Sequence, residues 1–178
     1  MLNFSEDSLE NATIDIFKSL GWNSQNCFEE TYGTEGTLGR ETPADVVLVR
    51  RLRSKLEEFN SDKPKEAIDQ AIAELTRNRS MLSPFSANQE VYKLLKEGVK
   101  VEYHGPDGHR THGRVQLIDW RNPNNNDYFL AKQLWISGDM YKRRADLVGF
   151  INGIPLLFIE LKAVHQRIQD SYRNNLTD

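Results

Sequence analysis

Three charged side chains stand at the ends of strand-like segments in the last third of the sequence. Asp146 opens an apolar stretch, and Glu160 and Lys162 come directly after or close to the apolar run 156–159. Side chains alternate along a strand, so Glu160 and Lys162 are expected on one face, with Leu161 on the other. The run before them is typical of a strand buried on both faces, where an uncompensated charge is costly. These charges are therefore expected to have a chemical role.

The turn between the two segments decides whether Asp146 joins Glu160. A two-residue turn at Asn152 and Gly153 would place Asp146 opposite Ile159, whereas a three-residue turn would place it opposite Glu160. We expect the three-residue turn. Opposed residues on neighbouring strands lie about 5 Å apart, so two carboxylates would converge with an ammonium beside them.

Two ionised carboxylates this close repel each other, and a divalent cation or a raised pKa on one of them removes that cost. Oxygen ligands of this kind suit Mg²⁺ or Mn²⁺. The metal would lower the pKa of a bound water, and Lys162 could orient or deprotonate that water or neutralise the transition state. The pattern predicts metal-assisted phosphodiester hydrolysis, with Asp146, Glu160 and Lys162 as catalytic residues.

Apolar periodicity and breakers predict helices first and strands afterwards. The expected helices cover residues 6–20, 44–59, a stretch that starts at Pro64, and 88–96. The expected strands cover residues 99–104, 114–120, 128–136, 145–151 and 155–162, and a further helix is expected from residue 164. This order favours an α+β fold with a mostly antiparallel central sheet flanked by helices, and a helical insertion in the N-terminal half.

The 178 residues fit one domain, with a helical part over about residues 1–97 and the sheet and catalytic hairpin over about residues 98–178. The net charge of −3 argues against a protein that holds nucleic acid by bulk positive charge. The acidic surplus lies in residues 1–36, which carry seven acidic side chains against one lysine. The single cysteine and the lack of a signal peptide or bilayer-spanning apolar stretch predict a cytoplasmic protein without membrane association.

The set Asp146, Glu160 and Lys162 resembles the catalytic core of the PD-(D/E)XK nucleases, with Ala145 where that family often has proline. Together with segments 116–120 and 125–128, the sequence is similar to the amino-terminal nuclease domain of the restriction (R) subunit of type I restriction enzymes. The resemblance covers most of the chain and is weakest over about residues 22–85. It implies a restriction-endonuclease-like core and Mg²⁺-dependent cleavage of double-stranded DNA.

The resemblance also implies further site residues. A glutamate on the first helix would join Asp146 and Glu160 at the metal, and Glu10 is the best match, with Glu6 second. On the helix after the lysine, a glutamine motif would contact DNA or support the site. The candidates for DNA contact are Arg143, Arg144, Gln166, Gln169 and Tyr172, although the last three depart from the family's Gln-X-X-X-Tyr spacing and Asn175 is an alternative.

The chain is expected to be a fragment, because apolar residues keep a four-residue spacing from residue 164 to the end without a helix stop. R subunits continue into an ATP-driven DNA-translocating motor, and no Gly-x-x-x-x-Gly-Lys-Ser/Thr segment occurs here. We therefore expect ATP to act on the full-length subunit without binding this part. The resemblance implies that modification and specificity subunits are partners of the full-length subunit.

Simpler interpretations stay open. The three charged residues could form a surface salt bridge at a strand end. A metal site could be read from a histidine triplet on either side of a turn, without carboxylate support: His104, His109 and His112. The alternative function is a non-catalytic DNA-binding or subunit-docking module that retains the nuclease fold.

Overall fold

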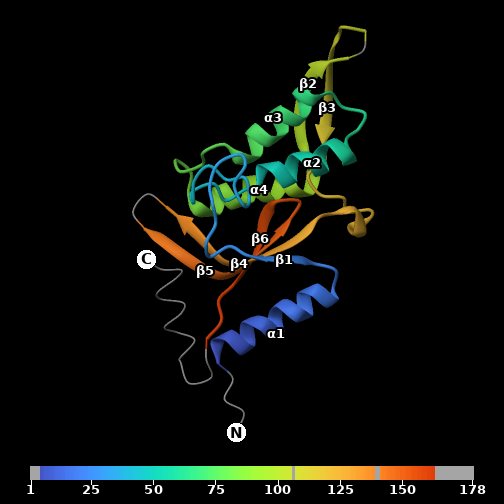
Figure 1. The fold of residues 1–178 in the computed structure, drawn as a ribbon. Helices are drawn as coiled ribbons and strands as arrows, with labels where there is room; N and C mark the ends of the chain where they lie inside the picture. The colour runs from blue at the N-terminus through green and yellow to red at the C-terminus, as the bar shows by residue number, and fades with distance from the viewer. Residues whose placement is uncertain (1–4, 106, 139–140, 163–178) are drawn as a thin grey trace. The chain divides into compact units, whose positions relative to one another are not determined.

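The computed structural model describes residues 5–105, 107–138 and 141–162 (Figure 1). The chain divides into two compact units. The sheet unit comprises Met1–Val46 and Tyr128–Asp178, and the helical unit comprises Val47–Asp127. The helical unit is thus one continuous segment between the two parts of the sheet unit.

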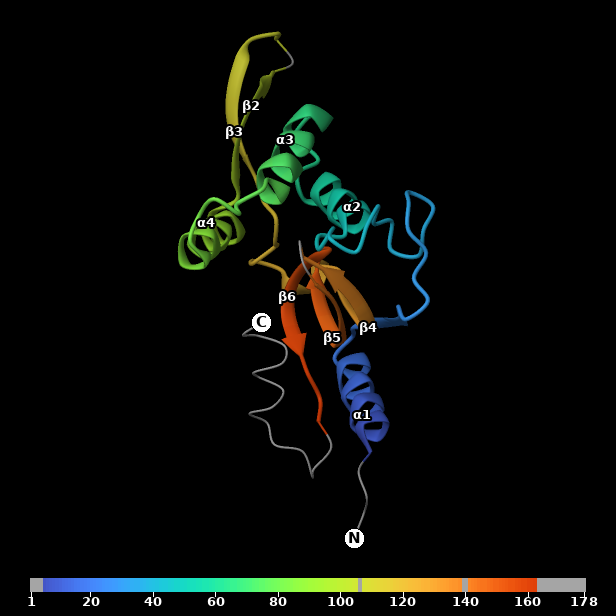
Figure 2. The same ribbon diagram turned by 90° about the vertical axis from the view of Figure 1, so that its left-hand side faces the viewer.

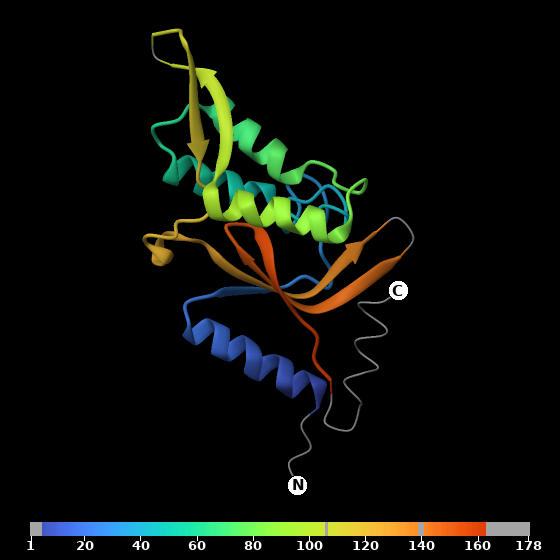
Figure 3. The same cartoon turned by 180° about the vertical axis from the view of Figure 1, so that it is seen from behind.

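The described part of the sheet unit holds a four-stranded sheet in the order β1-β4-β5-β6. β1 (Asn23–Asn26) runs parallel to β4 (Tyr128–Ser137), whereas β4 is antiparallel to β5 (Lys142–Ile151), and β5 to β6 (Ile154–Ile159). The helix α1 (Glu6–Ser19) covers one face of this sheet (Figures 2 and 3). The expected α+β class with a mostly antiparallel sheet is confirmed.

The helix α1 begins and ends where the sequence indicates. Ser5 is its N-cap, and the Ser5 hydroxyl oxygen accepts a hydrogen bond from the Ser8 amide at 3.2 Å. Gly21 follows the helix with a φ of 88°, a left-handed conformation that glycine adopts without strain. The inward face of α1 packs on the sheet in a small apolar core of Ile14, Leu130 and Leu147, surrounded by Phe17, Trp22, Ile159 and Leu161.

The β5–β6 hairpin turns in two residues, so the expected three-residue turn was wrong. Asn152 and Gly153 have φ values of 53° and 78°, as in the type I′ turn that an Asn-Gly pair favours. Further along the hairpin, the register shifts by one between Gly149 and Phe150, because Leu156 is an extra residue on β6.

Beyond this bulge, Leu147 pairs with Ile159. The next residues along the two strands are Asp146 and Glu160, so the predicted register is reached through a bulge within the hairpin. The turn chemistry was visible in the sequence, whereas an extra residue inside an apolar run leaves no signal in its periodicity.

The expected burial of β6 on both faces was also wrong. β6 lies at an edge of the sheet within the described residues, and Leu156, Leu157 and Phe158 are 41%, 37% and 46% exposed. An edge strand has a neighbouring strand on one side, and its side chains stay accessible where no second layer covers them. The burial of β6 therefore gives no support to a chemical role for Glu160 and Lys162.

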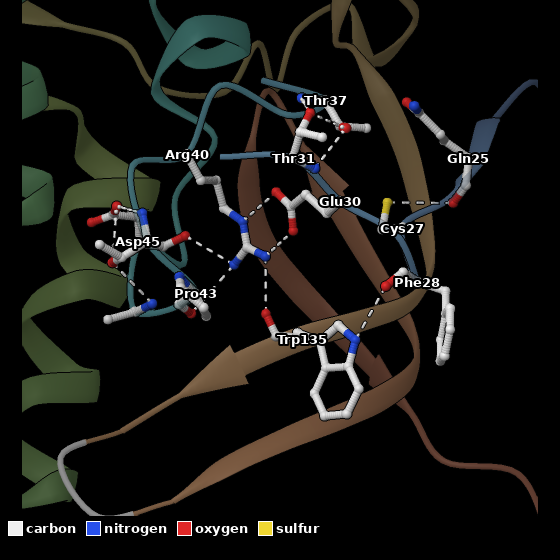
Figure 4. Close-up of polar contacts among 12 residues, drawn as sticks. Gln25, Cys27, Phe28, Glu30, Thr31, Thr37, Arg40, Pro43, Asp45 and Trp135 are labelled. Carbon is white, nitrogen blue, oxygen red and sulfur yellow. Dashed lines mark hydrogen bonds and ion pairs between the residues drawn. The ribbon is translucent and has the colours of Figure 1, made fainter. Parts of the chain in front are cut away.

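One buried ion pair holds the long segment that follows β1 (Figure 4). The side chains of Arg40 and Glu30 are both fully buried, and the Arg40 guanidinium donates to both carboxylate oxygens of Glu30. It also donates to the backbone oxygens of Pro43, Asp45 and Trp135, the last at 2.9 Å. Because Trp135 belongs to β4, this contact fastens a segment without regular structure to the sheet.

The helical unit contains α2 (Val49–Phe59), α3 (Lys65–Thr76) and α4 (Pro84–Glu97), followed by the antiparallel hairpin of β2 (Val99–His104) and β3 (Arg110–Val115). This hairpin forms a separate two-stranded sheet, and β3 begins earlier than the strand expected from residue 114. Buried apolar residues on α2 and α3 are Leu52, Leu56, Ala67, Ile68, Ala71, Ile72 and Leu75. None of the helices in the described ranges has both the length and the apolar character needed to cross a bilayer.

Replacing Arg40 by leucine is expected to destabilise the protein by about 3–5 kcal/mol, because the Glu30 carboxylate would stay buried without its partner. Urea unfolding followed by tryptophan fluorescence measures the loss. Arg53→Leu is the matched control: Arg53 and Asp69 form an ion pair whose side chains are 40% and 58% exposed, so its removal should barely move the unfolding midpoint. An Arg40→Leu protein as stable as the wild type would contradict this role of the buried pair.

Candidate active site

A cavity of about 590 Å³ lies between α1 and the sheet. Its walls come from the first half of α1, from the end of β1 and the residues after it, from β4 and β5, and from the residues beyond β6. The lining residues are Glu6, Asp7, Glu10, Asn26, Phe28, Glu29, Lys132, Gln133, Arg144, Asp146 and Leu161. Five of these side chains are acidic and two are basic, so the cavity favours cations.

Glu10 supplies the buried carboxylate of this cavity. It lies one turn before Ile14 on the inward face of α1 and is 4% exposed. Its Oε1 accepts a hydrogen bond from Nε2 of Gln133 at 2.8 Å, and its Oε2 lies 3.1 Å from Nζ of Lys132. A carboxylate can be buried in this way because it is both paired and hydrogen-bonded. Glu6, the second candidate for this position, is exposed.

Asp146 lies on β5 and lines the same cavity. Its Oδ2 accepts a hydrogen bond from the backbone amide of Leu161 at 2.8 Å, which ties the carboxylate to the chain just beyond β6. Glu10 and Asp146 are 136 positions apart in the sequence. The fold nevertheless brings both to the lining of one cavity. Two of the three carboxylates predicted to bind a metal are brought together in this way.

Glu160 and Lys162 follow β6 and lie beside each other, with 3.6 Å between Glu160 Oε1 and Lys162 Nζ. Their side chains are 17% and 29% exposed, and this proximity agrees with the expected shared face. Neither is among the residues that line the cavity of Glu10 and Asp146. Over residues 5–105, 107–138 and 141–162, no group of three or more His, Cys, Asp or Glu side chains is arranged to hold a metal. His104, His109 and His112 lie in these ranges, so the described structure does not bring them together as a metal site. The set of three carboxylates stays a prediction.

Sequence reasoning missed Lys132 and Gln133, which both contact Glu10. A signal was present, because two successive polar residues interrupt the apolar strand β4. In a regular strand, neighbours point to opposite faces, so a polar pair is not expected to serve one site. The positive φ of Gln133, 57°, is what permits it, and periodicity cannot reveal a backbone angle.

A row of cations and aromatic rings, here called the cationic strip, borders the cavity. It consists of Phe28, Trp135, Lys142 and Arg144. The guanidinium carbon of Arg144 lies 5.3 Å from the ring centroid of Phe28 and 5.7 Å from that of Trp135, and Nζ of Lys142 lies 4.8 Å from the Trp135 ring. Because cations cover these ring faces, the strip offers N–H donors and positive charge to a ligand.

Of the other candidates for DNA contact, the structure describes only Arg143. It lies on β5, between Lys142 and Arg144 in the sequence, and its guanidinium carbon is 6.0 Å from the ring centroid of Tyr141. Gln166, Gln169, Tyr172 and Asn175 lie outside the described residues.

Comparison with known proteins shows which family the chain resembles. Residues 3–178 match the family model described as "Type I restriction enzyme R protein N terminus". Over 168 residues, which are 91% of this chain and 15% of the relative, the sequence is 35% identical to the type I restriction enzyme HindI endonuclease subunit of Haemophilus influenzae. Over 175 residues, 95% of this chain and 16% of the relative, it is 29% identical to the putative type I restriction enzyme MjaIXP endonuclease subunit of Methanocaldococcus jannaschii.

The chain therefore spans about 15% of the length of the curated relatives it matches. The family match extends over both the helical unit and the sheet unit, including every residue of the candidate site. The chain belongs to the family of type I restriction enzyme R protein N termini.

Proposed function

We propose that residues 1–178 form the nuclease domain of a type I restriction enzyme R subunit and cleave double-stranded DNA by metal-dependent hydrolysis. One observation carries this proposal: Glu10 from the first helix and Asp146 from the motif share one acidic cavity. The names of the two relatives, both endonuclease subunits, support a nuclease role.

The donor set of the cavity fits a hard divalent cation. Its charged groups are mainly carboxylates, which are the ligands that Mg²⁺ and Mn²⁺ prefer, and their surplus over the basic groups attracts a cation. Glu10 and Asp146 would hold the ion, with Glu160 as the third ligand. When bound, the metal supplies a water of lowered pKa and stabilises charge on a phosphoryl oxygen.

The chain's own residues do the rest of the work. The amide of Leu161 fixes the Asp146 carboxylate, and the contacts from β4 fix that of Glu10. Lys162, held near Glu160, carries the ammonium that orients the attacking water or neutralises charge in the transition state. The cationic strip supplies phosphate contacts, and Arg143 and the residues Gln166, Gln169 and Tyr172 complete the proposed DNA contacts.

The activity of the whole protein is part of the same proposal. The full-length subunit would use ATP, bound outside this chain, to move DNA toward the nuclease site. The modification and specificity subunits of the type I complex would be its partners. Such a motor holds the substrate, which is why the nuclease domain has no need of a strongly basic surface.

A second candidate function is a non-catalytic DNA-binding or docking module. One observation favours it: Glu160 and Lys162 are not among the residues that line the cavity of Glu10 and Asp146 in the described part of the chain. The following experiment separates the two functions, because a docking module does not need the Asp146 carboxylate.

Asp146→Asn in the full-length R subunit, assembled with its partner subunits, is expected to lower the DNA cleavage rate by about 100-fold or more, because a charged ligand is lost. Cleavage is measured with supercoiled plasmid in Mg²⁺ and ATP. Asp15→Asn is the control, because Asp15 is an exposed acid on the same helix as Glu10. This variant is expected to cleave DNA at the wild-type rate. ATP hydrolysis should be preserved in both variants. Undiminished cleavage by Asp146→Asn would favour the docking module.

Replacing Lys142 and Arg144 by alanine in the full-length subunit is expected to weaken duplex DNA binding and to reduce its salt dependence. Each lost phosphate contact lowers the slope of log K against log salt concentration by about 0.9. Fluorescence anisotropy with labelled duplexes over a range of salt concentrations measures the slope. Lys18→Ala removes an exposed lysine from the last turn of α1 and serves as the control. A slope that is the same in all three proteins would exclude the strip from DNA contact.

A further inference from the structure

Gln133 has a backbone conformation that is unusual for a strand. Its φ is 57°, in the left-handed region, although it lies within β4 and is not glycine. Residues without special tolerance for this region are strained there, and such strain persists only where surrounding contacts enforce it. A backbone requirement alone would be met by glycine, or by asparagine, which accepts positive φ more readily. The glutamine side chain therefore needs a reason of its own.

At Gln133, the alternation of side chains between the two faces of β4 is interrupted. Leu130 packs toward α1, and Lys132, two residues on, lines the cavity on the same side, as regular alternation requires. Gln133 lines that cavity as well, and from Leu134 onward the even-numbered side chains of β4 line an apolar groove instead. Two consecutive residues, Lys132 and Gln133, thus reach Glu10.

On β5, the alternation of side chains is interrupted opposite the same residue. On β5, Leu147 packs with Ile14 of α1, so Val148 points to the opposite face and lines the apolar groove. Asp146 directly precedes Leu147, yet it lines the cavity on the α1 side. The β4–β5 ladder pairs Lys132 with Leu147 and Leu134 with Ala145, which places Gln133 opposite Asp146.

We infer that Gln133 is a positioning residue of the candidate metal site, and this inference rests on the proposed function. Its strained backbone keeps the amide directed at Glu10 Oε1, while Lys132 meets Oε2. An ammonium is a compact charge with little directional preference, whereas an amide N–H fixes the plane of the carboxylate it meets. Gln133 thus sets the direction in which Glu10 faces the cavity beside Asp146. The same rung brings the Asp146 carboxylate to the α1 side of the sheet.

Three variants of the full-length R subunit test this role: Gln133→Gly, Gln133→Asn and Asn152→Gly. Gln133→Gly relieves the backbone strain and removes the amide. It is expected to change the thermal unfolding midpoint little, because relief of the backbone strain opposes the loss of the hydrogen bond to the buried Glu10 carboxylate, and to weaken Mn²⁺ binding by about 10-fold, as is typical when a hydrogen-bond partner of a metal ligand is lost. Gln133→Asn keeps an amide that is one methylene too short to reach Glu10, so the same loss of affinity is expected.

Asn152→Gly is the matched control. Asn152 is the other non-glycine residue of positive φ in the described chain, and it lies in the β5–β6 turn, outside the residues that line the cavity. It should leave Mn²⁺ affinity unchanged. Binding is measured by titration calorimetry or by electron paramagnetic resonance of free Mn²⁺, without DNA and ATP.

A double variant decides whether Gln133 acts through Glu10. If it does, Glu10→Gln combined with Gln133→Gly should bind Mn²⁺ no more weakly than Glu10→Gln alone. Additive losses, or wild-type affinity in Gln133→Gly, would overturn the inference. If those results came from a protein that binds Mn²⁺ and loses cleavage in Asp146→Asn, the proposed function would stand and only the role of Gln133 would fall. A wild-type protein that binds no Mn²⁺ would overturn both.

Discussion

The carboxylate of Glu10 is buried between a helix and a sheet, and the need to compensate its charge constrains the rest of the candidate site. A buried charge must be met by donors, and β4 provides two of them from consecutive residues, Lys132 and Gln133. A regular strand can direct only one of two neighbours to a given face. The strand therefore adopts a left-handed residue at this point, and the neighbouring strand changes sides with it. At the same level of the ladder, opposite Gln133, Asp146 also lines the cavity.

The sequence predicted the parts of the fold that depend on local chemistry. Ser5 and Gly21 mark the ends of α1 because a hydroxyl cap and a positive φ are properties of single residues. The α+β class, the strand β2 and the expectation that Glu160 and Lys162 share a face follow from periodicity. The candidate Glu10 came from family resemblance; the structure buries it at the cavity, and its role at a metal stays a prediction.

The rest depends on contacts between distant segments. A bulge at Leu156 and a left-handed Gln133 are backbone choices made under tertiary constraint, so neither leaves a pattern in the apolar periodicity. The apolar composition of residues 156–158 suggested a central strand, but composition does not say on which side of a sheet the next strand lies. The β2–β3 hairpin has ordinary strand signals, and only its contacts show that it forms a sheet of its own.

In the described part of the chain, the exposed edge of β6 bears on how this segment pairs with other strands. Three accessible apolar residues in a row on an edge strand are a template for strand addition by another molecule, the first step of aggregation. Pro155 interrupts this run at one end, and the charged pair Glu160 and Lys162 follows it at the other, in the way gatekeeper residues flank an unavoidable apolar strand. The two side chains proposed for catalysis therefore also flank the exposed apolar run. Removing both at once would change the tendency to aggregate together with catalysis.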